Sequence, residues 1–359
     1  MDPLATLNAS VKAAREARGE QTDREATVEK FPDGLADLSK LGADRHEGAF
    51  AKGLWPTAIG KDKAAHALPW EVNPLGLFYR QDYFEKAGVD PTAISSWDDL
   101  IAAGRKILAA TGAQLLGLDK PGTTPDMDFF QNLMQLQGAF YFDRAGKITL
   151  ASPEAVQALT IIKRMNDDGL LADTAGQGTR KRLLSQGKLA TSPDPAWAVE
   201  YLAAKFPDQK GKWRAMQPPA AVPGGGRGAI VNSTYLAVAA FSKRRRAAWR
   251  FIEYALTKPA EINRMFTSGG VFPALSAAYT DSRFSAPHPF YGGQKVLKTF
   301  VDMLSSGSEA TNFTGDYTRA LKLAGDAQSQ VLVKGADPAR ALKDAAERLA
   351  QQTGRQQAA

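Results

Sequence analysis

The sequence predicts an α/β protein of two domains, and three observations support this prediction. The chain has 359 residues, whereas one hydrophobic core usually serves about 100 to 150 residues. Hydrophobic residues make up 44% of the chain and charged residues 23%, as in a folded globular protein. Apolar runs of strand length alternate with amphipathic helical patterns, which favours helices layered on a largely parallel sheet.

The first elements surround an unusual concentration of aromatic residues. Residues 1–30 are rich in Ala, Arg and Glu, which predicts a loosely anchored helix and a polar linker. A strand is predicted within 63–70, and an apolar run at 75–79 forms the next strand. The polar segment that follows, up to Gly88, has the composition of a helix. We therefore expect a loop between the two strands.

Helix-capping signals delimit the middle elements. Ser96 and Asp99 form a capping-box pattern, and Gly112 closes the helix that they begin. A strand is predicted at 113–118. Ser152, followed by proline, begins another helix, which ends near Gly169.

The second half of the chain is predicted to be mainly helical. A Pro/Gly loop at 218–231 precedes a buried strand at 235–241. The run SKRRR at 242–246 leads into helical apolar spacing, which indicates the solvated start of an amphipathic helix rather than a nucleic-acid patch. The last two helices run through Tyr317 and from Asp337 onward.

Composition argues against several classes of function. The absence of cysteine excludes disulfides, thiolate metal sites and cysteine catalysis. The histidines have no metal-ligand spacing, and GGGRG at 224–228 fits no nucleotide-binding fingerprint, so we predict no metal and no cofactor. A net charge of +7 is modest for this length, and we predict no nucleic-acid partner. No apolar run is long enough to span a membrane, and MDPLATLNAS lacks the features of a signal peptide.

Carboxylates near aromatic residues are the remaining candidates for chemistry. They are Glu71, Asp126, Asp128 and Asp194, all predicted in loops. Two carboxylates that flank a glycosidic bond can hydrolyse it. The same groups beside tryptophan can instead hold a sugar, because carboxylates accept hydrogen bonds from hydroxyls and an indole covers the apolar ring face. Spacing along the chain does not separate these alternatives.

Several segments together resemble the extracellular solute-binding proteins of ABC sugar importers, the family that includes maltose-binding protein. In chain order these segments are LPWEVNPLGLFYRQDYFEKAGVD, SSWDDLIAAGRKI, LLSQGKLATSPDPAWAVEYL, PGGGRGAIVNSTYLAVAAFSKRRRAAWRFIEYALT and SGGVFPAL. They follow the family's order from about Gly34 to the C-terminus. Each segment is weakly specific alone, and the order makes the set more specific.

The resemblance implies a fold of two α/β lobes joined by hinge crossovers, with the ligand in the cleft between them. On this basis lobe 1 would comprise 1–117 and 238–305, and lobe 2 would comprise 118–237 and 306–359. The first strand, helix and strand of the family lobe have no counterpart, so lobe 1 is expected to be truncated or reduced. The expected partners are a small-molecule solute, a sugar above all, and the permease subunits. The expected location is periplasmic or extracytoplasmic.

The resemblance also implies the ligand-binding residues. They are Trp70, Glu71, Asn73, Asp126, Trp197, Arg227, Tyr235, Phe272 and Tyr317. Aromatic residues are more often packed than free, so Trp70, Tyr235 and Phe272 could equally be core rings, and Arg227 a solvated loop cation. Trp197 is the strongest of these predictions, because it follows Pro193 and Pro195 in a predicted loop.

Three functions therefore stay open at this stage. The first is a binding protein without catalytic residues, which captures a sugar and presents it to a permease. The second is a carbohydrate hydrolase or lyase that uses Glu71, Asp126 and Asp194. The third is a degenerate binding fold that serves as a sensor or interaction module.

Overall fold

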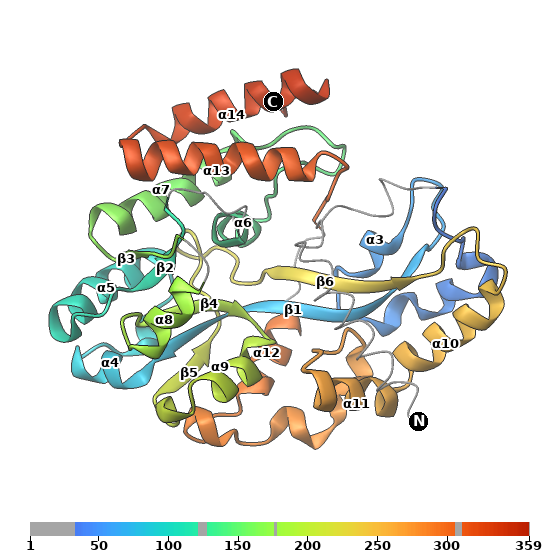
Figure 1. The fold of residues 1–359 in the computed structure, drawn as a ribbon, viewed down its shortest axis with the longest axis horizontal. Helices are drawn as coiled ribbons and strands as arrows, with labels where there is room; N and C mark the ends of the chain where they lie inside the picture. Colours follow the sequence, from blue (N-terminus) through green and yellow to red (C-terminus); the bar gives the residue numbers. More distant parts are fainter. Residues whose placement is uncertain (1–32, 121–127, 176–177, 306–310, 359) are drawn as a thin grey trace. The chain divides into compact units, whose positions relative to one another are not determined.

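The computed structural model describes residues 33–120, 128–175, 178–305 and 311–358 (Figure 1). The chain divides into two compact units. Unit 1 comprises Met1–Asn73, Asn232–Phe284 and Phe313–Thr318, and unit 2 comprises Pro74–Val231, Ser285–Asn312 and Arg319–Ala359. The chain thus passes between the units several times, and each unit is discontinuous in sequence.

The described helices and strands follow one another in mixed order. The strands are β1 (Ala67–Arg80), β2 (Leu116–Leu118), β3 (Leu171–Asp173), β4 (Thr191–Pro195), β5 (Trp213–Met216) and β6 (Ile230–Ala237). The helices up to the fifth strand are α3 (Trp55–Ala58), α4 (Gln81–Lys86), α5 (Trp97–Thr111), α6 (Asp128–Gln135), α7 (Pro153–Asp167), α8 (Thr179–Ser185) and α9 (Ala198–Lys205). The later helices are α10 (Arg245–Thr257), α11 (Pro259–Gly269), α12 (Val296–Ser305), α13 (Tyr317–Lys334) and α14 (Pro338–Thr353). None of the helices in the described ranges is long and apolar enough to cross a membrane.

Strand β1 is continuous where a loop was predicted. Its first part pairs within unit 1, where the amide of Val72 donates to the carbonyl of Phe272 at 3.0 Å. Its second part pairs in unit 2 with β4 and β5, both antiparallel. Pro74, which has no N–H to donate, stands where the strand changes partners. The separate strands predicted at 63–70 and 75–79 are therefore one strand.

The sheets correct the prediction of a largely parallel arrangement. The four-stranded sheet has β1 between β4 and β5, and β6 also pairs with β1. Figure 1 shows β1 in blue and β6 in yellow as neighbouring strands that run side by side. Only β2 and β3 form a parallel pair among the described strand pairs whose registers are known. The parallel sheet was predicted from the alternation of helices and strands along the chain. It is wrong because the long β1 pairs in antiparallel orientation with strands that are distant in sequence.

The aromatic run of β1 builds the core of unit 2. The ring of Phe78 lies 5.6 Å from that of Phe300 in α12 and 5.9 Å from that of Tyr291. Gly76 allows this approach, because a Cβ at this position would lie 2.6 Å from the Phe300 ring. These rings thus lie where β1 meets α12.

Helix α14 packs against α7, and an ion pair of 3.6 Å between Arg348 and Asp326 joins α14 to α13.

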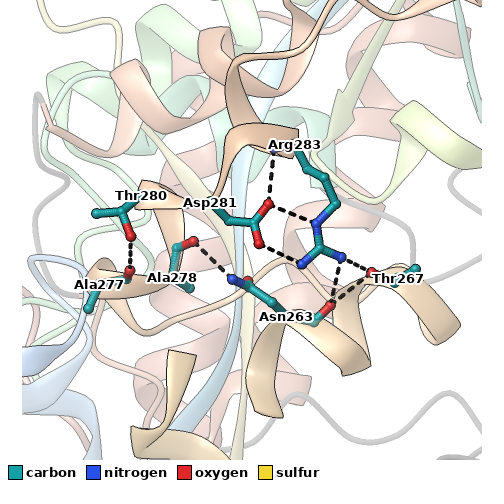
Figure 2. Close-up of polar contacts among 7 residues, drawn as sticks. All are labelled: Asn263, Thr267, Ala277, Ala278, Thr280, Asp281 and Arg283. Carbon is teal, nitrogen blue, oxygen red and sulfur yellow. Dashed lines mark hydrogen bonds and ion pairs between the residues drawn. The ribbon is translucent and has the colours of Figure 1, made fainter. Parts of the chain in front are cut away.

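Unit 1 has its own aromatic core, formed by α11 and the segment that follows it in the chain. Phe272 packs against the rings of Phe266, Tyr279 and Phe284 at 5.7 to 6.2 Å. Figure 2 shows the polar network that holds this segment, in which Arg283 donates to both oxygens of Asp281 at 2.8 Å. These hydrogen bonds lower the pKa of Asp281 far below its usual range. The segment after α11 is thereby fixed by both apolar packing and charge-assisted hydrogen bonds.

Figure 2 also shows how this network reaches helix α11. Arg283 donates from Nη1 to the carbonyl of Asn263 at 3.3 Å and to the hydroxyl of Thr267. The Asn263 amide donates in turn to the carbonyl of Ala278 at 3.1 Å. The last turns of the helix and the segment that follows it therefore form one hydrogen-bonded body.

Most predicted helix ends are confirmed. Ser96 and Asp99 form the capping box of α5, and Gly112 closes that helix in the left-handed conformation. Ser152 caps α7 and Asp337 caps α14 through their side chains. The strand predicted at 235–241 is displaced, since β6 starts within the predicted Pro/Gly loop and ends at Ala237. Residues 1–30 lie outside the described residues.

The compact units give a division of the chain separate from the predicted lobes, whose boundaries stay a prediction. The resemblance placed boundaries at 117/118, 237/238 and 305/306. The units change at Asn73/Pro74, Val231/Asn232, Phe284/Ser285, Asn312/Phe313 and Thr318/Arg319. Strand β1 spans the first of these changes, and its second half pairs with β4 and β5 of unit 2.

The capping box of α5 predicts a specific acid sensitivity. The Asp99 carboxylate accepts from the backbone N–H groups of Ser96 and Ser95 and from both hydroxyls, which lowers its pKa from 3.8 to about 2. A lowered pKa in the folded state stabilises the fold above pH 3.8, and this contribution is lost as the pH falls towards about 2. We expect Asp99→Asn to flatten the dependence of unfolding free energy on pH across this window, as measured by urea denaturation. Asp344→Asn, at an exposed site on α14, is the control and should retain the wild-type slope; equal slopes for Asp99→Asn and wild type would contradict the assignment.

Candidate functional site

A row of paired polar side chains lies along β1 and β6 in unit 1. The hydroxyl of Thr234 donates to Glu71 at 3.0 Å, and the amide of Asn73 donates to Asn232 Oδ1 at 2.8 Å. Side chains two positions apart share one face of a strand, so these four groups lie on the same face. Asn73 is buried, and its Oδ1 has no hydrogen-bond partner among the described residues. The row therefore contains one enclosed acceptor that no described residue uses.

Two other predicted residues of unit 1 lie on the same two strands, at positions that alternate with the row and therefore face the other side. Trp70 is buried, and its indole N–H has no hydrogen-bond partner in the described part of the chain. The Tyr235 hydroxyl donates to the carbonyl of Leu54 at 3.0 Å and accepts from Ser233 at 3.2 Å. Burial raises the pKa of Tyr235. Trp70 thus keeps an unused donor, whereas the Tyr235 hydroxyl is engaged in structural hydrogen bonds.

In unit 2, strand β4 carries a buried charged group. Asp194 pairs with Gly76 of β1 and is buried. Its Oδ2 accepts from Arg180 Nη2 at 2.5 Å and from the hydroxyl of Ser192 at 2.6 Å, and the same Arg180 nitrogen also donates to that hydroxyl at 2.6 Å. Sequence reasoning named Asp194 but not Arg180 or Ser192. The alternation of Ser192 and Asp194 on one strand face is a signal that could have found the serine.

Trp197 differs from the other tryptophans of the chain. The side chains of Trp55, Trp70, Trp97, Trp213 and Trp249 are all buried, whereas Trp197 is 38% exposed. Trp197 follows β4 after Ala196 and occupies the N-cap position of α9, and its ring meets that of Tyr201 edge-on at 5.6 Å. A large apolar ring held in place but open to solvent is suited to stacking against a ligand.

Arg227 holds the Pro/Gly loop of unit 2. Its Nε donates to the carbonyl of Pro218 at 2.8 Å, and its Nη2 donates to that of Gln217 at 3.0 Å. Desolvation by burial lowers the pKa of the Arg227 guanidinium. The side chain was predicted to contact ligand, and the structure gives it a loop-closing role.

Two predicted residues belong to cores. The side chain of Phe272 is fully buried in the ring cluster of unit 1. Tyr317 is also buried, with its ring 5.0 Å from that of Phe313. Their packing gives neither ring an exposed face for a ligand. Asp126 lies outside the described residues.

A separate cavity of about 300 Å³ lies within unit 2. Its walls come from the end of α6 and the segment that precedes α7, and they include Gln135, Phe140, Asp143, Thr149, Glu154 and Asn312. Gln135 is buried, and neither atom of its amide group has a hydrogen-bond partner among the described residues. None of the eight predicted binding residues that the structure describes lines this cavity.

The titratable groups form no metal centre in the part of the chain that the structure describes. Each histidine instead contacts a single carboxylate. His46 lies 2.8 Å from Glu253, His66 lies 3.0 Å from Asp62, and His288 lies 3.5 Å from Glu200. The histidines therefore make separate local contacts with carboxylates and form no cluster.

Comparison with known proteins identifies the family. The family model of bacterial extracellular solute-binding proteins matches residues 27–262. The chain belongs to this family. The resemblance inferred from the order of sequence segments is thus confirmed, and so is the predicted two-lobe α/β fold class.

Two curated members of the solute-binding family and one solved structure illustrate the similarity. A lactose-binding protein of Rhizobium radiobacter is 28% identical over 275 residues, which cover 75% of this chain and 64% of that protein. An arabinooligosaccharide-binding protein of Bacillus subtilis strain 168 is 30% identical over 225 residues, which cover 62% of this chain and 51% of that protein. This solute-binding chain therefore spans about half to two thirds of the length of these curated relatives.

The structural comparison covers more of the chain. The ABC transporter associated binding protein from B. animalis subsp. lactis, solved in complex with beta-1,6-galactobiose, has a TM-score of 0.74 at 22% identity. The match covers 92% of this solute-binding chain and 82% of the other. At this identity the likeness establishes the fold.

Proposed function

We propose that this protein is the solute-binding component of an ABC importer and that it captures a carbohydrate. The observation that carries the proposal is Trp197, the exposed exception among six tryptophans, at the end of a strand with a buried charged cluster. An indole face covers the apolar C–H surface of a sugar ring, and polar groups nearby bind its hydroxyls. The names of the relatives, which bind lactose and arabinooligosaccharides, support this class of ligand.

The polar row of unit 1 is the second group that we propose for ligand binding. The Asn73 Oδ1 of this row and the Trp70 indole N–H on the other face of β1 are buried, and neither has a hydrogen-bond partner among the described residues. Leaving such groups unpaired costs about 1 to 3 kcal/mol each, so a ligand hydroxyl or a water that satisfies them is stabilising. We therefore propose two separate groups of ligand contacts: Glu71, Asn73 and Asn232 within unit 1, and Asp194 and Trp197 within unit 2.

We further propose that binding occurs without catalysis. The Asp194 oxygen that faces Arg180 and Ser192 already accepts two short hydrogen bonds, and Glu71 accepts one from Thr234. These contacts give both carboxylates a role within the fold, and the relatives are named as binding proteins, which supports binding alone. The proposed site of action is outside the cytoplasm, and the proposed partners are the sugar and the permease subunits of the importer.

A ligand panel tests this function. We expect the melting temperature of the intact protein to rise with lactose, an arabinooligosaccharide or galactobiose, because a ligand that binds only the folded state stabilises it. At one hundred times its Kd, a ligand should contribute about 2.7 kcal/mol. Chromatography of the same mixtures should show unchanged sugar. Release of product would favour the hydrolase or lyase, and the absence of saturable binding to every sugar would favour the sensor module.

A further inference from the structure

Helix α10 and the loop before it carry a dense group of cations in unit 1. The exposed basic residues, which we call the basic face, are Lys243, Arg244, Arg245, Arg246, Arg250 and Lys258. None of them forms an ion pair with a carboxylate in the described ranges. The acidic residue within this stretch, Glu253, is already engaged by Arg45 and by His46, whose Nε2 lies 2.8 Å away. The basic face therefore keeps its positive charge.

The stability of α10 does not account for these cations. Arg244 is the N-cap of the helix, and Arg245 and Arg246 are its first residues, with no acidic side chain in the first turn. The N-terminal end of a helix carries a partial positive charge, so cations there are unfavourable. The buried face of α10, formed by Trp249, Ile252, Ala255 and Leu256, anchors the helix without help from the basic residues.

Exposed aromatic rings accompany the basic face. Phe241 is 87% exposed, Phe251 is 37% exposed and Tyr254 is 53% exposed. These are three of the six large hydrophobic side chains that are exposed among the described residues. Phe251 and Tyr254 are three positions apart and therefore neighbours on the outer side of α10. The surface thus combines positive charge with exposed apolar rings. Charged side chains alone would be enough to keep a helix face solvated, so the rings need a separate explanation.

We propose that the basic face docks on an anionic lipid bilayer. An interfacial helix that binds such a surface has Lys and Arg among its polar residues and aromatic rings that enter the boundary between headgroups and acyl chains. Single-stranded nucleic acid also binds cations and aromatic rings, but it does so in a groove that follows its backbone. Arg250, Phe251 and Tyr254 are exposed on α10, away from its buried face, and the other cations flank them at the start and the end of the helix, which suits a broad partner. Docking would hold the protein at the membrane whichever sugar it binds.

Vesicle sedimentation tests the proposal with the intact protein. We expect binding to phosphatidylcholine vesicles that contain phosphatidylglycerol, and none to pure phosphatidylcholine. Each cation near an anionic surface contributes roughly fivefold in affinity. Combined Lys243→Gln, Arg244→Gln, Arg245→Gln and Arg246→Gln substitutions should therefore weaken binding about a hundredfold or more. Phe241→Ser should weaken it about tenfold, and this loss should persist at high salt because it is hydrophobic.

The control removes the same charge elsewhere. Lys322→Gln, Lys334→Gln, Arg340→Gln and Lys343→Gln lie at exposed positions on α13 and α14 and should leave vesicle binding within about twofold. The basic-face variant should fold as stably as wild type and bind sugar equally well, so this test is separate from that of sugar capture. Equal losses in both variants, no binding of wild type to anionic vesicles, or tighter binding to single-stranded DNA than to vesicles would each overturn the proposal.

Discussion

Replacing Trp197 by alanine is expected to weaken sugar binding tenfold to a hundredfold while the fold stays intact. The free energy involved, about 1.5 to 3 kcal/mol, is that of burying a large apolar side chain against a ligand. Trp197 is 38% exposed in the free protein, and its ring contact with Tyr201 is edge-on, so truncation opens no enclosed cavity. Isothermal titration with the sugar found by the ligand panel measures the affinity, and thermal unfolding measures the stability.

Two further variants calibrate the Trp197 result. Trp197→Phe keeps an aromatic face and should retain most of the affinity. Val333→Ala removes part of another exposed apolar side chain, on α13, and should change neither affinity nor stability. Unchanged affinity in Trp197→Ala would remove this ring from the binding site. A loss of several kcal/mol in stability would show that the ring supports the core instead.

Replacing Phe272 by alanine is expected to lower the free energy of unfolding by about 3 to 5 kcal/mol, the usual cost of deleting a buried phenyl ring. Phe272 is fully buried and contacts three other rings. The carbonyl of the same residue accepts the hydrogen bond from Val72 of β1, so the cavity would lie next to the strand that carries Glu71 and Asn73. Guanidinium denaturation of wild type and variant measures the difference.

The matched substitution is Phe241→Ala, which deletes the same ring from an 87% exposed position. It should change the free energy of unfolding by no more than about 0.5 kcal/mol. A Phe272→Ala variant with wild-type stability but weakened sugar binding would restore the original prediction that this ring contacts the ligand.

Local signals in the sequence were sufficient to predict most of the helix ends. The capping box of Ser96 and Asp99 and the side-chain caps at Ser152 and Asp337 all act over three residues. Gly112 closes α5 because glycine adopts the left-handed conformation without steric cost. These interactions are complete within one helical turn, so the residues that make them are visible together in the chain.

The binding residues were only partly predictable. Loop position and the flanking prolines pointed to Trp197, and the structure shows that its ring is exposed. The pairing of Arg180 with Asp194 was not visible, because α8 and β4 come together only in the folded unit. Phe272 and Tyr317 have the aromatic character expected of sugar contacts, and only packing reveals that both rings are enclosed.

The sequence by itself determined the family, the α/β class and the helix termini of this protein, because each depends on residue order or on contacts between near neighbours. The tertiary structure alone decided that Trp70, Glu71 and Asn73 lie in a continuous strand, since a strand exists only where a partner supplies its hydrogen bonds. Those partners lie near Phe272, in β4 and in β5, roughly 110 to 200 residues away along the chain. The limits of the two units and the burial of each aromatic ring depend on the same long-range pairing.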